Sequence, residues 1–331
     1  MNSFSYTRAS NVASAVRAVT ADRDAVFIAG GTNLIDLMKE NVARPPHLVD
    51  ITRLPLNRIE ELPNGGLRLG ALVTNADTAY NAAVERRYPI LSRAILAGAS
   101  PQLRNMATNG GNLLQRTRCY YFYDTATPCN KRDPGAGCSA INGFNRIHAI
   151  LGTSDQCIAV HPSDMCVALA ALEAVVHVTG TNGDRTIPLA EFHRLPGDTP
   201  HIDTNLRTDE IITSIDLPPK GFADHYAYLK LRDRTSYAFA LVSVAAALEM
   251  HGDTITETRL ALGGVAHKPW RNLDAEGMLN GIRATKDHFE AVGEAIIRSA
   301  HGFGHNTFKI ELARRAVVRA LQQAARVGRK S

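Results

Sequence analysis

A chain of 331 residues is too long for one ordinary hydrophobic core, so we expect two or three domains. Its 45% hydrophobic and 21% charged residues are typical of a globular protein, and no apolar run reaches the ~20 residues of a membrane span. The formal net charge is +5, but the basic residues are scattered and 6% of residues are aromatic, which argues against a nucleic-acid partner.

The N-terminal segment, residues 1–16, lacks the apolar core of a signal peptide, so we expect no export signal on this chain. A helix is predicted at 10–19 and a short apolar strand at 25–28, which runs into the sequence AGGTNL. Glycines at 30 and 31 would allow the backbone to approach a phosphate closely. A glycine pair alone is more often plain turn chemistry, and this one is neither a Walker motif nor a GxGxxG fingerprint.

Further strands are predicted at 47–51 and 66–74, followed by helices at 75–86 and 90–99. A second polar turn, TNGGN at 108–112, then repeats the chemistry of the first. Two amide-rich turns suit a dinucleotide such as FAD, which has two phosphates to neutralise and a long adenosine tail to hold.

Four of the five cysteines fall within one stretch directly after this turn: Cys119, Cys129, Cys138 and Cys157. A quartet of thiolates is what an iron-sulfur cluster requires. The gaps of nine, eight and eighteen residues match neither the close cysteine pairs of zinc sites nor the ferredoxin patterns. Spacing alone therefore leaves a cluster, a zinc ion and unrelated cysteines as alternatives.

The segment around these cysteines has little regular periodicity, which predicts an irregular insertion organised by something other than a hydrophobic core. A loop, a helix and a strand are predicted after it, with Ser163 or Asp164 as the helix N-cap. Cys166 falls on the apolar run of that helix and is interpreted as a core residue.

The remainder of the chain is typical of a separate α+β unit. A strand is predicted within 209–219, where it ends at a proline. The segment 226–250 then leads into a strand pair around 251–253, and amphipathic helices are predicted at 287–299 and 308–327.

Four motifs, AGGTNL, TNGGNLLQ, PSDM and LKLRDRTSYAFALVSVAAAL, occur in an order that resembles the FAD-binding subunit of the molybdenum hydroxylases, the xanthine dehydrogenase family. The resemblance covers nearly the whole chain. It implies an α+β fold: a vanillyl-alcohol-oxidase (PCMH) type FAD-binding fold of two subdomains, at 1–60 and 61–220, and a C-terminal α+β domain at 221–331. The cysteine insertion at about 116–160 departs from the ordinary family member. It resembles the 4Fe-4S loop of the 4-hydroxybenzoyl-CoA reductase flavin subunit and, more closely, the medium subunit of exported bacterial aldehyde oxidoreductases.

The resemblance also implies where the cofactors bind. The first turn would wrap the FAD pyrophosphate, Asp164 would contact the ribityl or adenosine region, and Lys230 would lie near the isoalloxazine. The predicted FAD-binding residues are Val26, Phe27, Ile28, Ala29, Gly30, Gly31, Thr32, Asn33, Leu34, Thr108, Asn109, Gly111, Asn112, Gln115, Asp164, Ile211, Ile212 and Lys230. The predicted ligands of a 4Fe-4S cluster are Cys119, Cys129, Cys138 and Cys157. No catalytic residue is assigned, because the cofactors carry the redox chemistry.

The function implied by the resemblance is that of an FAD-binding electron-transfer subunit in a heterotrimeric molybdenum-containing aldehyde oxidoreductase. Its partners would be a molybdopterin-binding large subunit and a 2Fe-2S small subunit, with an external electron acceptor. Export to the periplasm would depend on a signal-bearing partner, with a cytoplasmic location as the alternative. The alternative functions are the flavin and 4Fe-4S subunit of a 4-hydroxybenzoyl-CoA reductase-like enzyme and, more distantly, a zinc-stabilised interaction protein.

Overall fold

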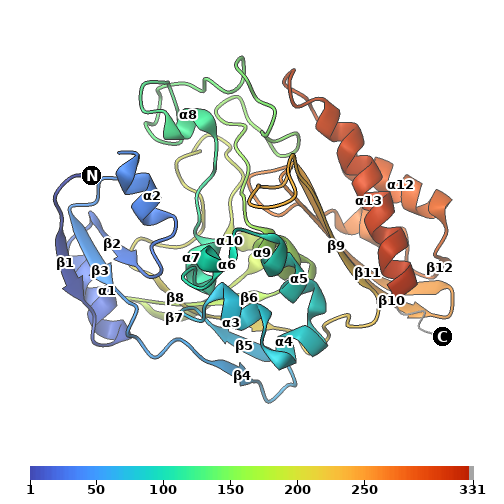
Figure 1. Ribbon diagram of the computed structural model, residues 1–331, viewed down its shortest axis with the longest axis horizontal. Helices are drawn as coiled ribbons and strands as arrows, with labels where there is room; N and C mark the ends of the chain where they lie inside the picture. The colour runs from blue at the N-terminus through green and yellow to red at the C-terminus, as the bar shows by residue number, and fades with distance from the viewer. Residues whose placement is uncertain (328–331) are drawn as a thin grey trace.

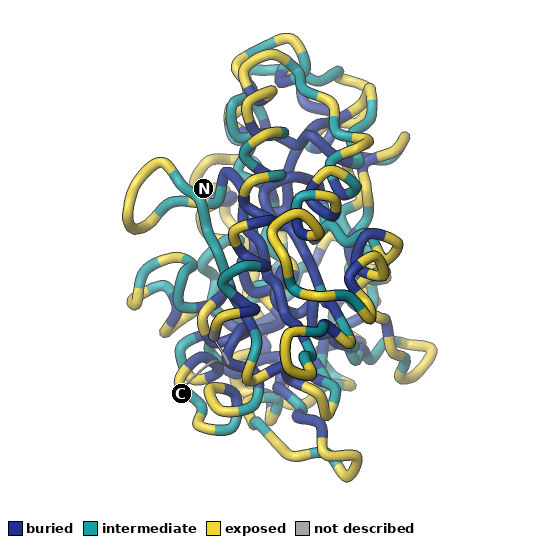
Figure 2. Tube along the Cα trace, turned by 90° about the vertical axis from the view of Figure 1, so that its right-hand side faces the viewer, coloured by how far each residue is buried: buried dark blue, intermediate teal, exposed yellow. Residues whose placement is uncertain are grey.

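The computed structural model describes residues 1–327. Three β-sheets follow one another across the molecule, with helices between and beside them (Figure 1). Buried residues gather in the interior, and the apices of the loops are exposed (Figure 2). None of the helices within the described range combines the length and the apolar character that a membrane crossing demands.

The first sheet is parallel, with the order β1-β3-β2, and is formed by β1 (Ser5–Arg8), β2 (Ala25–Ile28) and β3 (His47–Asp50). Helix α1 (Val12–Ala21) packs against it and begins with a reciprocal cap, in which Ser14 N donates to Asn11 Oδ1 at 2.8 Å. Helix α2 (Leu34–Lys39) follows the first glycine turn directly. The short β2–α2 connection thus places that turn at the carboxyl end of a strand.

The second sheet has the order β4-β5-β8-β6-β7 and is antiparallel throughout. Its strands are β4 (Ile59–Glu61), β5 (Leu67–Gly70), β6 (Val175–Gly180), β7 (Gly183–Pro188) and β8 (Ile211–Leu217). The associated helices are α3 (Asn75–Ala79), α4 (Ala82–Arg87), α5 (Pro89–Ala97), α6 (Pro101–Arg104), α7 (Asn109–Leu113), α9 (Asp164–Ala171) and α10 (Leu189–Phe192). All eight residues of α9 are buried, because α9 shares one hydrophobic core with the second and third sheets.

The third sheet has the order β12-β11-β10-β9 and consists of β9 (Tyr226–Leu231), β10 (Val242–His251), β11 (Thr254–Gly263) and β12 (Ile282–Arg283). The helices of this unit are α11 (Leu273–Gly277), α12 (Lys286–Ile297) and α13 (Phe308–Val327). Alternate residues of β10 serve two cores, with Ala245 and Ala247 in the core shared with α9, and Ala246 in the core shared with α13. Small side chains on both faces let helices approach this strand from both sides.

The cysteine insertion contains one short helix, α8 (Tyr120–Tyr123), and is otherwise irregular. It forms the upper part of the molecule in Figure 1. Unlike the expectation, it has a small apolar cluster of its own, in which Phe122 and Ile158 pack against Leu37 of α2. The Arg132 guanidinium also donates to backbone carbonyls of Tyr121, Phe122 and Asp124. Apolar packing and side-chain hydrogen bonds therefore contribute to the organisation of the loop.

The expected α+β fold is confirmed, and two local predictions need correction. The helix predicted at 75–86 is two helices, because Asn81 caps a new one by accepting from Ala83 N at 3.0 Å and Val84 N at 3.2 Å. The segment 226–250 holds two strands of its own, β9 and β10, and the predicted pair around 251–253 is the tight turn between β10 and β11. The domain boundaries stay a prediction.

Candidate functional site

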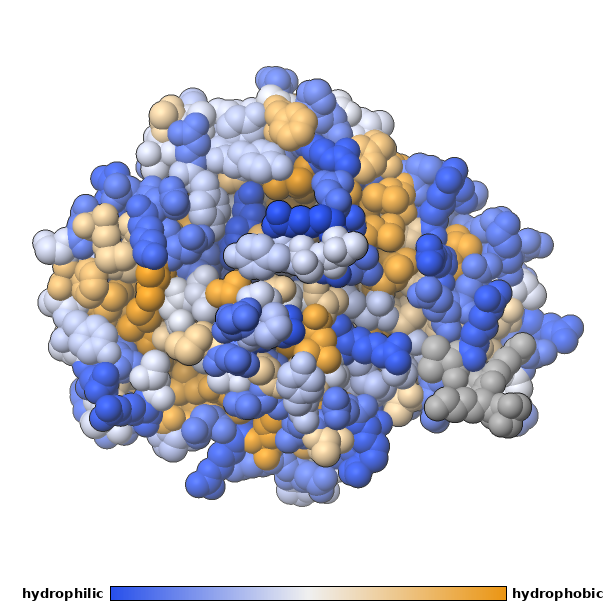
Figure 3. Space-filling model, viewed as in Figure 1, coloured by the Kyte–Doolittle hydropathy of each residue, from blue (hydrophilic) through white to orange (hydrophobic). Residues whose placement is uncertain are grey.

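A cavity of about 770 Å³ opens between the two glycine turns, the start of α9, the third sheet and the cysteine loop. This volume falls within the ~300–1,000 Å³ of ordinary ligand pockets. Hydrophilic side chains lie across the middle of the face seen in Figure 3, below the cysteine loop. Six of the predicted FAD-binding residues are in the cavity wall: Thr32, Asn33, Gly111, Asn112, Gln115 and Asp164.

The first glycine turn presents unpaired hydrogen-bond donors. The backbone N–H groups of Gly31, Thr32 and Asn33 have no hydrogen-bond partner among the described residues. The buried Nδ2 of Asn33 has none either, although Asn33 Oδ1 accepts from Arg116 N at 2.9 Å. Buried donors without partners are costly, and a phosphate group would satisfy them. The first turn is therefore suited to an anionic ligand.

Because Gly30 has no side chain, the backbones of the two turns can approach each other closely. A Cβ atom at this position would lie 1.8 Å from Met106 O, so no residue with a side chain fits. The backbone of the first turn thus contacts the segment that leads directly into the second turn. Gly31 has a φ of +70°, in the left-handed region that favours glycine.

The backbone N–H groups of the second glycine turn have hydrogen-bond partners within the protein. It forms α7, where Thr108 Oγ1 accepts from Gly111 N at 3.2 Å and Gly110 N donates to Ala71 O at 2.8 Å. Asn109 is fully buried and donates from Nδ2 to Thr78 Oγ1 at 2.9 Å, which supports the turn from behind. This turn contributes three residues to the cavity wall: Gly111, which has no side chain to occupy the cavity, and Asn112 and Gln115, which have side-chain amides.

Asp164 is in the cavity wall and forms hydrogen bonds with two side chains of β9. Its Oδ1 accepts from the Tyr228 hydroxyl at 2.6 Å, and its Oδ2 accepts from Lys230 Nζ at 2.8 Å. The Asp164 and Lys230 side chains are 8% and 5% exposed. Burial and the neighbouring carboxylate raise the pKa of Tyr228 well above its usual value. Ser163 is the helix N-cap, accepting from Cys166 N at 3.0 Å, so the Asp164 carboxylate has no capping role.

We expect Asp164→Ala to lower FAD retention and to reduce the free energy of unfolding by about 3 kcal/mol, because breaking a buried ion pair leaves the Lys230 ammonium without its carboxylate. Bound flavin and thermal unfolding measure the two effects. Glu210→Ala is the matched control, because it breaks the Arg185–Glu210 pair at 2.6 Å, outside the cavity wall. Equal FAD retention in both variants would assign Asp164 a purely structural role.

The other predicted residues lie behind the cavity or in the cores. Residues 26–28 are the strand that carries the first turn, and Lys230 reaches the wall through Asp164. Ile211 and Ile212 are 2% and 4% exposed and pack within hydrophobic cores, outside the cavity wall. The FAD-binding roles of all these residues stay predictions.

Several wall residues were not predicted, among them Arg104, Arg118, Tyr120, Tyr123, Arg234, Tyr237 and Phe239. Two signals could have identified most of them. One is the aromatic run CYYFYD at the start of the insertion, and the other is the basic and aromatic run RDRTSYAF within the fourth motif. Aromatic and arginine side chains suit the rings and phosphates of a nucleotide.

A second, much smaller cavity has all four predicted cluster ligands in its wall. Cys129 and Cys138 face each other across a short antiparallel bridge. His148 Nε2 lies 3.1 Å from Cys119 Sγ, and Ala159 N donates to Cys157 Sγ at 3.4 Å. Burial raises the pKa of the Cys119 thiol to about 12 and that of the Cys157 thiol to about 11. A positively charged metal centre would be needed to hold these groups as thiolates.

Within residues 1–327, the one set of three metal-ligating side chains with donor atoms within 4.8 Å of one another is His161, Cys166 and His193. The four loop cysteines are not part of this set.

The histidine pair beside Cys166 has a structural explanation. His193 Nε2 lies 2.8 Å and His161 Nε2 lies 3.3 Å from the carbonyl oxygen of Leu113. Burial lowers the pKa of both imidazoles, so both are neutral and can donate to that oxygen. Cys166 itself is fully buried in the core that contains α9.

The two cavities share one stretch of chain. Cys119 is in the wall of the cysteine cavity, and its neighbours Arg118 and Tyr120 are in the wall of the large cavity. The chain therefore crosses from one cavity to the other over three residues.

Comparison with known proteins agrees with this geometry. Residues 2–220 match the family model described as the FAD binding domain in molybdopterin dehydrogenase, and residues 226–324 match the CO dehydrogenase flavoprotein C-terminal domain. The chain is 51% identical to the aldehyde oxidoreductase FAD-binding subunit PaoB of Escherichia coli (strain K12), over 98% of this chain and 99% of that protein. It is 27% identical to the glyceraldehyde dehydrogenase medium chain of Sulfolobus acidocaldarius, over 97% and 98% of the two chains. A solved structure of carbon monoxide dehydrogenase from Hydrogenophaga pseudoflava superimposes with a TM-score of 0.77 at 28% identity, covering 98% of this chain and 97% of that chain.

Proposed function

Because the chain belongs to the family of FAD-binding subunits of molybdopterin dehydrogenases, we propose that it is the electron-transfer subunit of a heterotrimeric molybdenum-containing aldehyde oxidoreductase. The observation that carries this proposal is the 51% identity to an aldehyde oxidoreductase FAD-binding subunit over almost the full length of both chains. The same identity favours aldehyde oxidation over the 4-hydroxybenzoyl-CoA reductase alternative. A non-catalytic, zinc-stabilised protein does not fit this family.

We infer that FAD binds in the large cavity. Its first turn offers the free amides of Gly31, Thr32 and Asn33, together with the unpaired Asn33 Nδ2, to the pyrophosphate. Asn112 and Gln115 add side-chain amides from the second turn, and the Asp164–Lys230 pair lies at the start of α9. Bound FAD accepts and donates electrons, and this chain's residues hold it, orient it and surround it with protein.

The partners would be a molybdopterin-binding large subunit and a 2Fe-2S small subunit. Substrate oxidation would take place on the large subunit, so this chain needs no acid or base for hydroxylation. Electrons would pass through the small subunit to FAD and on to an external acceptor.

We further propose that Cys119, Cys129, Cys138 and Cys157 ligate one 4Fe-4S cluster on this chain. Two observations support the assignment: one cavity brings all four together, and an imidazole and a backbone amide lie against the sulfurs of Cys119 and Cys157.

The test is cofactor analysis of the complex purified anaerobically with its partners. We expect molybdenum, one FAD that acid or heat releases completely, and iron and acid-labile sulfide beyond the content of the small subunit. A parallel complex in which the four cysteines are serines should contain about four fewer irons. A complex without FAD would refute the flavoprotein assignment, and zinc without extra sulfide would refute the cluster.

The location of the complex is also a proposal. The resemblance of the cysteine insertion to that of exported aldehyde oxidoreductases leads us to propose co-export to the periplasm with a signal-bearing partner. Cell fractionation should find this chain in the periplasm when all subunits are expressed and in the cytoplasm when the partner's signal is deleted. Periplasmic accumulation without the partner would contradict co-export.

A further inference from the structure

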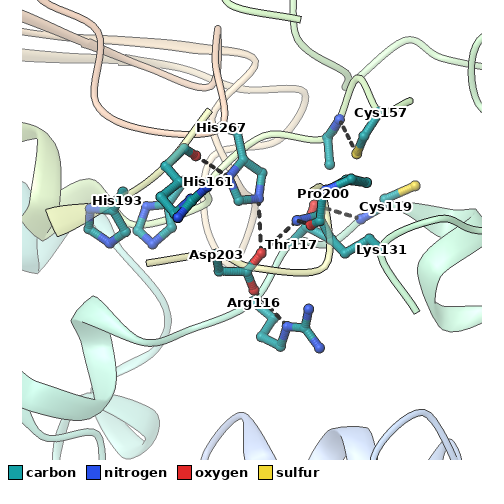
Figure 4. A network of polar contacts seen from close by, with 12 residues as sticks. Arg116, Thr117, Cys119, Lys131, Cys157, His161, His193, Pro200, Asp203 and His267 are labelled. Atoms are coloured by element: carbon teal, nitrogen blue, oxygen red, sulfur yellow. Dashed lines mark hydrogen bonds and ion pairs between the residues drawn. The ribbon is translucent and has the colours of Figure 1, made fainter. Parts of the chain in front are cut away.

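A buried lysine lies beside the cysteine cavity. Lys131 follows Cys129 by two positions, is in the wall of the cavity with all four cysteines, and has a side chain that is 1% exposed. Its Nζ lies 2.6 Å from Asp203 Oδ1 and 2.5 Å from Pro200 O (Figure 4). Solvent therefore screens this ammonium very little.

The surroundings of Lys131 leave a surplus of positive charge. Asp203 also accepts from Arg116 Nε at 2.7 Å, and His267 Nε2 lies 3.4 Å from its Oδ1 (Figure 4). Burial opposes ionisation of Asp203, but Arg116 and Lys131 outweigh it and keep its pKa low. Burial lowers the pKa of His267 to about 4, so this imidazole is neutral. Two cations thus share one carboxylate.

Lys131 shares the wall of one small cavity with all four cysteines. Because its side chain is almost completely buried, its charge is screened little by solvent within that cavity. A buried ammonium in this position favours any negative charge that appears in the same cavity.

We propose that Lys131 tunes the reduction potential of the cluster: a fixed, buried cation that stabilises the reduced form, held in position by Asp203, whose negative charge moderates the effect. This inference rests on the cluster assigned under the proposed function. In the reduction, one electron from an external reductant enters the cluster, no bond to the four thiolates breaks, and the net charge becomes more negative by one unit. A nearby cation lowers the energy of the more negative state most, because charge and hydrogen bonding around a cluster set its potential.

An electrostatic role of Lys131 and a purely structural role predict different results. Lys131 links the cysteine loop to residues 200–203, so a purely structural role would make Lys131→Met and Asp203→Asn behave alike, with loss of iron or no change in potential. An electrostatic role predicts opposite signs, because one variant removes a positive charge and the other removes a negative charge.

The experiment is a redox titration of the holoenzyme, followed by the electron paramagnetic resonance signal of the reduced cluster, with iron content measured in parallel. We expect a more negative midpoint for Lys131→Met, a more positive one for Asp203→Asn, and a value nearer the wild type for Lys131→Arg. Arg146→Met is the control: Arg146 is on the same loop, but its side chain is 40% exposed and paired with Asp233 at 2.7 Å, so its removal should leave the midpoint unchanged.

An unchanged or more positive midpoint in iron-replete Lys131→Met would overturn the inference. If that variant holds no cluster, Asp203→Asn decides, and an unchanged or lower midpoint there would overturn it. If Asp203→Asn loses its iron as well, the role is structural and the inference is wrong. A wild-type complex without the second cluster would instead refute the cluster assignment itself.

Discussion

Replacing Cys129 with serine is expected to abolish iron binding by this chain. A serine hydroxyl is a much poorer ligand than a thiolate, and burial leaves no solvent molecule to take its place. Cys129 is a better choice than Cys119, because Arg118 and Tyr120 beside Cys119 are in the wall of the large cavity. Iron and acid-labile sulfide in the anaerobically purified complex measure the outcome.

Cys166→Ser is the matched control for this experiment. Cys166 is fully buried on α9, outside the wall of the cysteine cavity, so its replacement should leave iron unchanged. The irregular loop should keep part of its structure without the cluster, because the hydrogen bonds from the Arg132 guanidinium to backbone carbonyls do not involve the cysteine side chains. Full iron content in Cys129→Ser would show that this residue is not a ligand.

Gly111→Val is expected to weaken FAD binding at least tenfold, which corresponds to about 1.4 kcal/mol. Gly111 is in the cavity wall, and the nearest atom to an added Cβ is Thr108 Oγ1 at 3.0 Å, so the rest of the branched side chain would take space that the cofactor needs. Flavin fluorescence during titration of the deflavinated complex gives the affinity, and thermal unfolding reports on the fold.

Gly277→Val is the control for a glycine-to-valine change in a helix, because a Cβ at Gly277 of α11 would have no neighbour within 4 Å. Gly31→Val is a less informative test than Gly111→Val. Gly31 has a φ of +70° and an added Cβ would lie 2.7 Å from Ile35 Cδ1, so the substitution would strain the turn itself. A folded Gly111→Val variant with wild-type affinity would remove the second turn from the FAD site.

The elements that could be predicted from sequence are those whose pattern has one physical explanation. The strand Ala25–Ile28 is a short apolar run with a glycine pair shortly after it, and the helix Phe308–Val327 is strongly amphipathic, so the strand is predicted to the residue and the helix at about these bounds. The sequence does not predict β10 as a separate strand, because its run of alanines lacks the alternation of polar and apolar residues that is typical of a half-exposed strand. That run makes sense only once helices cover both faces of the sheet.

Some residues of the candidate site could be predicted from the sequence and others could not. The glycine turns and the cysteines could be singled out because each has a local chemical signature. Asp203 could not, since it lies in an irregular segment without a motif and meets Lys131 across 72 positions of sequence. Its role follows from two cations that reach it from elsewhere in the chain. Long-range partnerships of this kind have no local pattern to reveal them.

The three-residue crossing between the cavities has a consequence for assembly of the enzyme. With the proposed cluster ligand at Cys119 and residues of the large cavity on either side of it, ordering this stretch for one cofactor would reduce the entropy that the other must lose on binding. The two binding equilibria would then be thermodynamically linked, and each cofactor would raise the affinity for the other by the same factor. Chains that carry one cofactor alone would be under-represented at equilibrium, so maturation in the cell would favour empty and fully loaded subunits over half-loaded ones.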